Sequence, residues 1–222
     1  MSDHSSTKQP VLDMRGRFYS AGAFLFVMLS ALVLGGLTSP AQQYLPEFMN
    51  SFANSCSGWV LLVSLVIWFS RLRPLPASAA GAAAFVLMVE GYRIVSQWRG
   101  FYYGEPFQDR FTVIGVAVGP IIGLSIALLR YGTRAWRTLA VIPVSTVLLG
   151  EGIYGLTVIS ETTSPIFWWL MIAAAATFSL LVFWRQRPAP KIAVPAVLLI
   201  MLGAGTFWWA YSNLDQLLAS GS

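Results

Sequence analysis

Two glutamates, Glu90 and Glu151, lie inside stretches of sequence that are otherwise apolar, LMVEGYRIVSQW and LLGEGIYGLT. A carboxylate placed within a hydrocarbon layer costs about 3 kcal/mol on insertion scales. Such a side chain therefore turns towards a partner or a water-filled cavity, and it is a candidate functional residue. Two carboxylates at one depth could orient a polar ligand, or they could act as a general acid and a general base.

Each glutamate has polar companions at helical spacing. Glu90, Arg93 and Gln97 recur at i, i+3 and i+7, so they share one face of a helix. Glu151 and Tyr154 share a face of a second helix, where neighbouring glycines allow another backbone to come close. The alternative interpretation is a structural clamp, in which Arg93 pairs with Glu90 or bridges to Glu151.

The composition is typical of an integral membrane protein. Of the 222 residues, 56% are hydrophobic and only 10% are charged, whereas soluble domains carry about 25% charged residues. The excess of Lys and Arg lies in short clusters between apolar runs and accompanies no stacking module, so we expect no nucleic-acid partner. With one cysteine, Cys56, and one histidine, His4, we expect no internal disulfide, no metal site and no cofactor.

Seven stretches are long and apolar enough to cross a bilayer as helices, since a span needs about 20 such residues. The predicted fold is therefore all-α, a polytopic membrane helix bundle with seven transmembrane helices. The spans are residues 18–37, 58–69 extended back through 49, 77–97, 111–129, 138–159, 166–184 and 192–211. We predict a tail over residues 1–17, a seven-helix domain over 18–211 made of three helical hairpins plus one helix, and a second tail over 212–222.

The basic residues predict the orientation of these spans. Eleven of the fourteen Lys and Arg residues fall on one side of the predicted bundle. By the positive-inside bias that side is cytoplasmic, which places the N-terminus inside and the C-terminus outside. Glu90 and Glu151 then lie about two-thirds of the way towards the outer surface.

Other polar residues also gather on the predicted outer side. The external segment 38–57 is rich in amides and is predicted to form a lid over a pocket; the next external loop is dense in aromatic and charged residues. Helix capping is the alternative role for the two asparagines of the lid. The predicted ligand-binding residues are Glu90, Tyr92, Arg93, Gln97, Glu151, Tyr154, Gln42, Gln43, Asn50 and Asn54.

Two motifs carry a resemblance to a known group of proteins. With LGGLTSPAQQYLPEFMNSFANS and LLGEGIYGLT the chain resembles a family of small multi-pass membrane proteins of unknown function found mainly in actinobacteria. This resemblance implies a bacterial cytoplasmic membrane. In size and in its long first external loop, the chain is also similar to the S-components of energy-coupling-factor vitamin transporters. Those proteins usually have six helices and an AxxxA motif in the first, where this chain has only Ala31-x-x-x-Gly35.

These observations predict a solute-binding or transport protein with a polar pocket that opens to the extracytoplasmic side. Its partners would be the lipid bilayer, a small polar or amphipathic ligand and other membrane transporter subunits. A first alternative is a membrane-embedded enzyme that uses Glu90 and Glu151 as acid and base on a lipophilic substrate. The size and paired acids resemble small membrane terpene cyclases, although their motifs are not visible. A second alternative is a structural or assembly subunit of a membrane complex.

Overall fold

A computed structural model describes residues 9–214 of the chain, and the side chains of residues 20–214. Within the described residues the chain forms only helices, which confirms the predicted all-α class. The helices are α1 (Gln9–Tyr44), α2 (Glu47–Ala53), α3 (Cys56–Ser70), α4 (Pro74–Trp98), α5 (Arg110–Tyr131), α6 (Arg134–Leu139), α7 (Ile142–Thr157), α8 (Pro165–Gln186) and α9 (Pro190–Ser212).

The number of possible membrane-spanning segments is six or seven, against the seven that were predicted. Six segments are long and apolar enough to cross a membrane, and one of them joins α6 to α7. A seventh is obtained if α2 and α3, which meet at a bend of 65°, count as one broken span. The chain is therefore a multi-pass helical bundle with six spans, or seven with the broken one.

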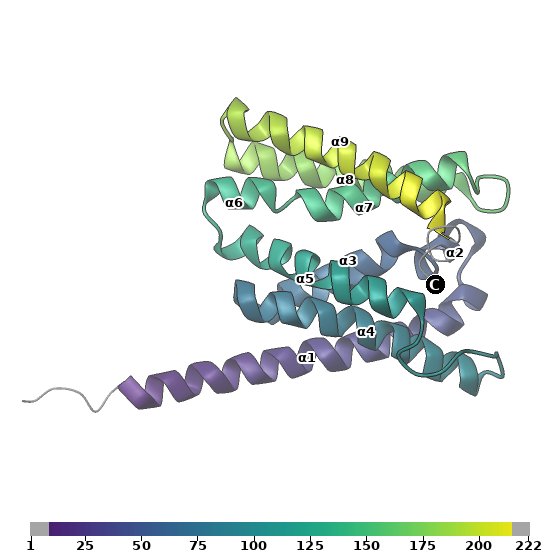
Figure 1. The fold of residues 1–222 in the computed structure, drawn as a ribbon, viewed down its shortest axis with the longest axis horizontal. Helices are drawn as coiled ribbons and strands as arrows, with labels where there is room; N and C mark the ends of the chain where they lie inside the picture. The colour runs from purple at the N-terminus through teal and green to yellow at the C-terminus, as the bar shows by residue number, and fades with distance from the viewer. Residues whose placement is uncertain (1–8, 215–222) are drawn as a thin grey trace, which may run out of the picture.

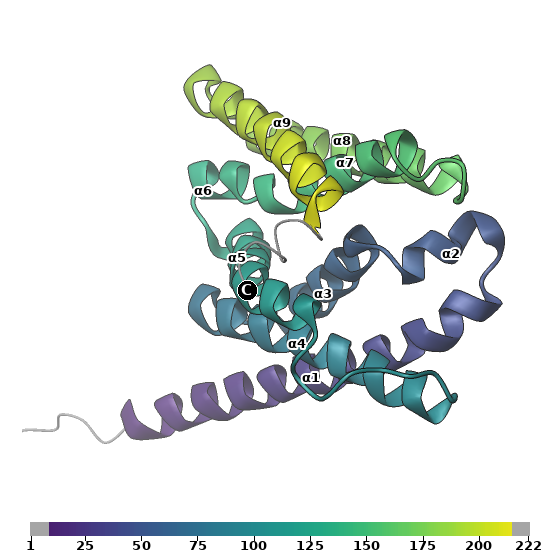
Figure 2. The same ribbon diagram turned by 45° about the vertical axis from the view of Figure 1, so that its right-hand side comes forward.

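The long helices form two groups (Figures 1 and 2). In the first group α4 packs against both α1 and α5, and in the second α7 packs against both α8 and α9. Helix α3 lies between the groups and contacts α1, α4, α5 and α7. Of the predicted hairpins, α4–α5 and α7–α8 pack closely, whereas α1 contacts α4 far more extensively than it contacts α3. Each glutamate lies on the central helix of its group.

Small residues allow the first group to pack closely. A Cβ atom on Gly119 of α5 would collide with the backbone of Gly81 on α4, and one on Gly123 would collide with the backbone of Ala77. On the other face of α4, Gly91 lies equally close to α1. Such small residues, spaced four apart, are the usual means by which membrane helices approach each other. Helix α4, which carries Glu90, is thus fixed between two neighbours.

The predicted fifth span is divided into α6 and α7. Pro143 lies at the start of α7 and has no N–H to donate to the carbonyl four residues earlier, so the helix breaks there. The hydroxyl of Ser125 on α5 donates to the carbonyl of Ala140 at this break. A backbone acceptor freed by the break therefore has a partner inside the bundle, where water cannot supply one.

The segment 38–57, predicted to be an external loop, is largely helical. Helix α1 continues to Tyr44 and α2 begins at Glu47. The continuation is stabilised by buried hydroxyls at the end of α1: Thr38 donates to the carbonyl of Gly35 at 2.6 Å, and Ser39 accepts from the hydroxyl of Ser96 on α4 at 2.9 Å. Hydropathy falls at Thr38, but the helix does not end there, because Thr38 bonds within α1 and Ser39 finds a partner on α4.

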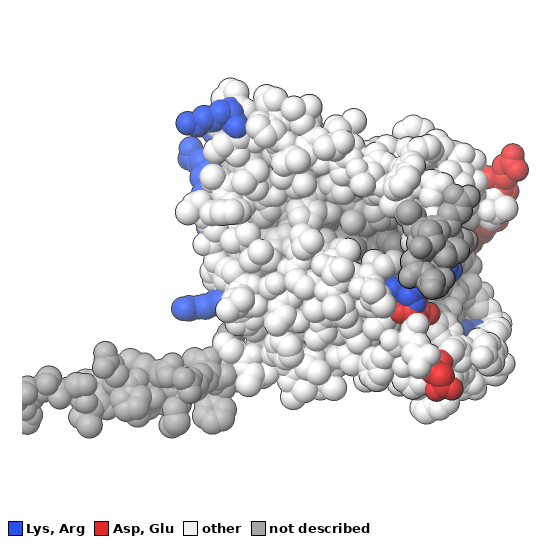
Figure 3. All heavy atoms as spheres, viewed as in Figure 1, with Lys and Arg blue, Asp and Glu red and all other residues white. Residues whose placement is uncertain are grey.

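The two ends of the bundle differ in charge: one end shows Lys and Arg alone, whereas the other shows Asp and Glu with some Lys or Arg among them (Figure 3). We call the end where α3, α5 and α8 finish the basic end, and the opposite end, where α1, α4 and α7 finish, the acidic end. This difference agrees with the predicted charge asymmetry, and the membrane side that each end faces stays a prediction. Of the predicted tails, residues 1–8 and 215–222 lie outside the described residues, and residues 9–17 form the first turns of α1.

Candidate functional site

Glu151 is bound to the start of another helix. Its side chain, on α7, is buried with 2% exposure, and its two oxygens accept hydrogen bonds from the backbone N–H groups of Cys56 at 2.8 Å and Ser57 at 2.6 Å. These are the first two residues of α3. The next N–H, that of Gly58, donates to the hydroxyl of Ser55 at 2.9 Å. The first three N–H groups of α3, which have no partner within their own helix, are therefore satisfied.

This arrangement also suits the charge of a carboxylate. The start of a helix carries about half a positive charge from the aligned peptide dipoles. A carboxylate that accepts two N–H bonds there is stabilised both by hydrogen bonding and by that dipole. In this structure Glu151 thus joins α7 of the second helix group to the start of the bridging helix α3.

An aromatic cluster centred on Tyr211 of α9 lies close to Glu151. The rings of Tyr154 and Tyr211 meet edge to face with centroids 4.9 Å apart, and Phe207 stacks on Tyr211 at 5.3 Å. The Tyr211 hydroxyl lies close to the Cys56 thiol and to Glu151. The predicted companion Tyr154 is therefore near Glu151, in contact with α9 through an aromatic pair.

Glu90 pairs with Arg93, which confirms one form of the predicted clamp. The Arg93 Nε lies 2.7 Å from Glu90 Oε2, and Glu90 is only 4% exposed. Arg93 also donates to Gln97 Oε1 at 2.9 Å, so the predicted shared face of Glu90, Arg93 and Gln97 is a connected set. The hydrogen bonds of Glu151 go to other groups, so the proposed bridge from Arg93 to Glu151 is not the pairing observed.

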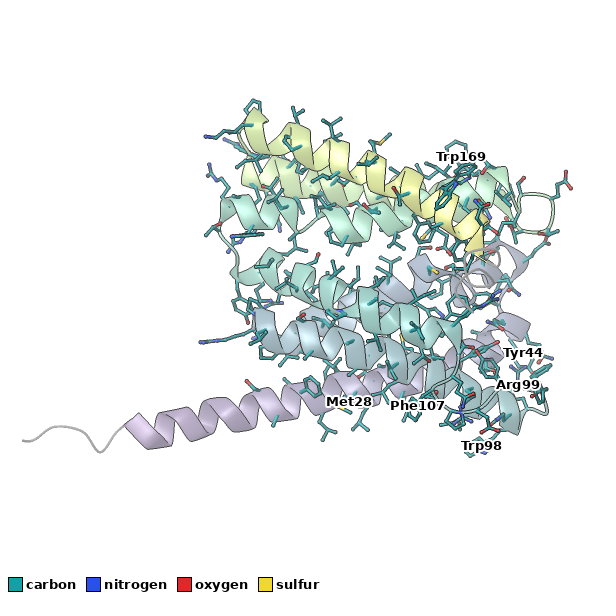
Figure 4. The ribbon with its side chains drawn as sticks, viewed as in Figure 1. Met28, Tyr44, Trp98, Arg99, Phe107 and Trp169 are labelled. Carbon is teal, nitrogen blue, oxygen red and sulfur yellow. The ribbon has the colours of Figure 1, made fainter. Side chains whose placement is uncertain are left out.

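The second oxygen of Glu90 fixes the loop between α4 and α5. Its Oε1 accepts from the backbone N–H of Phe107 at 2.7 Å. Phe107 has a φ of 60°, a left-handed conformation that is uncommon outside glycine, so this contact holds a strained point of the loop. Gln97 adds a second attachment by donating to the carbonyl of Tyr103 at 3.3 Å. Phe107 lies beside the lower helix group at the acidic end (Figure 4).

Tyr103 links the same loop to the start of α5. Its hydroxyl donates to Asp109 Oδ2 at 2.7 Å, and Asp109 Oδ1 accepts from the N–H of Phe111 as a helix cap. Burial, and after it the hydrogen bond and negative charge of Asp109, raise the pKa of Tyr103 above its ordinary value. The Tyr103 ring meets that of Tyr92 edge to face, with centroids 5.5 Å apart.

The amides of segment 38–57 form a cluster around Gln42. Gln42 Oε1 accepts from the Tyr92 hydroxyl at 2.9 Å, and its Nε2 donates to Asn54 Oδ1 at 3.3 Å. Asn50 donates to the carbonyl of Gln42 at 2.6 Å. The side chain of Gln43 has a different partner, because its oxygen accepts from Arg99. The cluster attaches α2 to α1 and α4.

The predicted ligand residues thus fall into separate sets. Glu90 and Glu151 share no hydrogen-bond partner among the described residues, and a ligand-binding role for either set stays a prediction. Several residues of these sets were not predicted. Asp109 and Ser55 could have been found, because such residues directly before an apolar run are typical helix caps. The sequence carries no signal that the first backbone N–H groups of α3 would bind Glu151, or that the backbone N–H of Phe107 would bind Glu90.

Two shallow, open hollows of the described surface lie elsewhere. One, of about 500 Å³, is at the acidic end and is lined by Glu47, Phe48 and residues 160–166; we call it the acidic-end hollow. Another, of about 370 Å³, lies along the outward face of α9 and includes Gly205 and Trp209. The predicted ligand-binding residues line neither of them.

The fold and the buried polar groups define a multi-pass helical membrane protein, held together by hydrogen bonds between its spans. The chain belongs to the family of unknown function DUF6518, whose family model matches residues 17–216. No curated protein and no solved structure matches the chain. The resemblance to a family of unknown function is thereby confirmed. The actinobacterial distribution and the likeness to S-components stay predictions.

Proposed function

We propose that this protein is a membrane solute-binding or transport protein that takes a small polar or amphipathic molecule from its acidic end. The observation that carries the proposal is the broken span α2–α3, because α3 begins inside the bundle, where Ser55 and Ser57 are buried. Membrane transporters commonly bind solutes at broken helices, where backbone groups can make polar contacts within the membrane. At this break Glu151 and Ser55 accept from the first three N–H groups of α3, so a solute would bind there by replacing the Glu151 carboxylate.

The arrangement of the helices supports the same function. Helix α3 lies between the α1–α4–α5 group and the α7–α8–α9 group, and direct contact between those groups is limited. In alternating access, one group of helices moves against another around a central solute. Here the bonds from Glu151 to Cys56 and Ser57 connect the second group to α3. These bonds are the ones that such a movement would stretch.

The direction of uptake follows from the charge asymmetry. By the positive-inside bias the basic end faces the cytoplasm, and we place the protein in a bacterial cytoplasmic membrane on that basis and on the resemblance stated above. The Gln42 cluster with Tyr92 then lies at the outer side, where a polar solute arrives. The lipid bilayer and other transporter subunits are the partners that this function implies.

Thermal unfolding of the purified protein in lipid nanodiscs tests the proposal. Amino acids, amines, vitamins and other polar metabolites would be added singly, and a ligand at 100 times its Kd should stabilise the fold by about 2.7 kcal/mol. Tyr92→Phe removes the hydroxyl that binds Gln42 and should reduce the stabilisation by a true ligand. Tyr44→Phe, at a residue that is 76% exposed, is the matched control and should leave it unchanged.

The same experiment separates this function from a structural one. Both buried carboxylates bind groups of this same chain, as expected if their role is structural, so a structural or assembly subunit is the second candidate function. If no solute stabilises the wild type and proteoliposomes take up none of the panel, the transport proposal is wrong. Co-purification of a stoichiometric membrane protein partner in that case would support the assembly role instead.

A further inference from the structure

The basic end of the bundle carries positive charge that no acidic side chain of residues 20–214 compensates (Figure 3). All six Asp and Glu side chains in that range lie in α2, in the later halves of α4 and α7, or in the loops at the acidic end. A surface with one sign of charge attracts ligands of the other sign. The turns at the basic end hold eight cationic residues, namely Arg71, Arg73, Arg130, Arg134, Arg137, Arg185, Arg187 and Lys191.

Two of these arginines are held in place where α3, α5 and α6 meet. The guanidinium of Arg130, on α5, lies over the ring of Trp68 on α3, with 4.2 Å between its Cζ and the ring centroid. Its Nη2 donates to the Trp68 carbonyl at 2.9 Å. Arg137, on α6, donates through its own Nη2 to the carbonyl of Arg130 at 3.0 Å. These contacts attach both side chains to the protein in defined positions.

The protein leaves most of the hydrogen-bonding capacity of these two arginines unused. A guanidinium has five N–H donors, and the single carbonyl bond of each is its only hydrogen bond to a described residue. The Nε of Arg137 is buried and has no acceptor there. A buried charged donor without a partner is unfavourable, so a ligand that supplies acceptors to this side chain is favoured. The planar guanidinium fork fits the paired oxygens of a phosphate.

The surroundings favour the phosphate of a membrane lipid over a soluble anion. Trp68, Tyr131 and Trp136 lie at the same helix ends and are exposed. Exposed Trp and Tyr side chains at the ends of spans are typical of the level of the lipid headgroups. Exposed Leu65 lies one turn before Trp68 on the same face of α3 and extends this surface towards the middle of the bilayer. A lipid contacts both the arginines and this apolar face, whereas a soluble anion contacts only the arginines.

We propose that Arg130 and Arg137 bind the phosphate of an anionic phospholipid, together with Arg134, which is exposed one turn before Arg137 on α6. A zwitterionic lipid also carries a phosphate, but its ammonium group would lie among the positive charges of the basic end, so a lipid with net negative charge is favoured. The proposal does not depend on the transport function or on the membrane side that the basic end faces.

Native mass spectrometry of the full chain, delipidated in a neutral detergent and then titrated with lipid, tests this proposal. The probes are phosphatidylglycerol, which is anionic, and phosphatidylcholine with the same acyl chains, which is zwitterionic. We expect one tightly bound phosphatidylglycerol and much weaker binding of phosphatidylcholine. An arginine near an anionic headgroup contributes about a fivefold change in affinity. Arg130→Gln and Arg137→Gln should therefore each weaken phosphatidylglycerol binding about fivefold.

Two further variants separate this site from effects of folding and of net charge. Arg134→Gln changes an exposed side chain without a described partner, so its thermal midpoint should stay at the wild-type value while phosphatidylglycerol binding weakens about fivefold. Arg187→Gln removes the same charge at the same end, in the turn between α8 and α9 and outside the contacts that hold Arg130 and Arg137. It should bind phosphatidylglycerol as the wild type does.

Each remaining outcome counts against the proposal. Equal affinity for the two lipids would show that the site does not select an anionic headgroup. Equal losses in Arg134→Gln and Arg187→Gln would show that binding follows net charge, and wild-type affinity in Arg134→Gln would remove the site from this corner of the bundle. If inorganic phosphate raises the thermal midpoint as much as phosphatidylglycerol does, the ligand is a soluble anion and the assignment to a lipid is wrong.

Discussion

The replacement of Glu151 by glutamine isolates the role of this carboxylate at the start of α3. In the wild type, both carboxylate oxygens accept backbone N–H groups, from Cys56 and from Ser57. A glutamine side chain of nearly the same shape has one acceptor oxygen and one NH2 donor. If its oxygen binds the N–H of Ser57, its NH2 group faces the N–H of Cys56, and two donors oppose each other.

The expected loss of stability in Glu151→Gln follows from the loss of one hydrogen bond and of one negative charge. A buried N–H left without an acceptor costs about 1–3 kcal/mol. Removal of a negative charge from a partly buried helix start costs up to about 2 kcal/mol. With Glu151 only 2% exposed, water cannot replace either contribution, so Glu151→Gln should destabilise the fold by about 3 kcal/mol. Glu151→Ala exposes both amides and should cost more.

Reversible unfolding in mixed micelles with increasing SDS, followed by tryptophan fluorescence, gives the free energy of unfolding directly. Glu161→Gln is the control, because it makes the same chemical change at an exposed carboxylate without a described partner. It should remain within about 0.5 kcal/mol of the wild type. Hydrogen exchange at the first amides of α3 should also become faster in Glu151→Gln, since those N–H groups lose their acceptor.

The reasoning is refuted if Glu151→Gln unfolds at the same SDS fraction as the wild type, or if Glu161→Gln is destabilised as much. Equal loss in both variants would mean that the effect comes from net charge and that the bonds to α3 contribute little. Unchanged exchange at Cys56 and Ser57 would show that their acceptor is not the Glu151 carboxylate.

Two other perturbations follow from the packing and from the loop between α4 and α5. Gly119→Ala should destabilise the bundle by about 1–3 kcal/mol in the same SDS assay, because the new methyl group would collide with the backbone of Gly81. Gly205→Ala, where a Cβ would meet nothing within 4 Å, should be neutral, and equal losses would contradict the packing argument. The pKa of Tyr103 is raised by burial and by Asp109, so its contribution to stability is complete below about pH 10 and is lost as the pH rises above that value. Tyr103→Phe should abolish this part of the alkaline loss, as measured by unfolding between pH 8 and pH 11.

Local regularities explain the part of the fold that could be predicted from sequence. Apolar runs of sufficient length must be helices in a bilayer, because only a helix satisfies its own backbone there, and the observed spans agree. Helical periodicity placed Glu90, Arg93 and Gln97 on one face, and their hydrogen bonds confirm it. The clustering of Lys and Arg between spans likewise predicted that the two ends of the bundle differ in charge, and they do.

Tertiary structure decided which faces meet. The partners of Glu151 lie 95 and 94 residues away in the sequence, and the partner of Glu90 in the loop between α4 and α5 lies 17 residues away. Helix α1 packs mainly on α4, although α3 is nearer in the sequence. Periodicity tells which residues share a face of one helix, but it carries no information on which other helix covers that face. That choice depends on close packing between backbones at small residues, and on where a broken helix leaves N–H groups that only a distant carboxylate can reach.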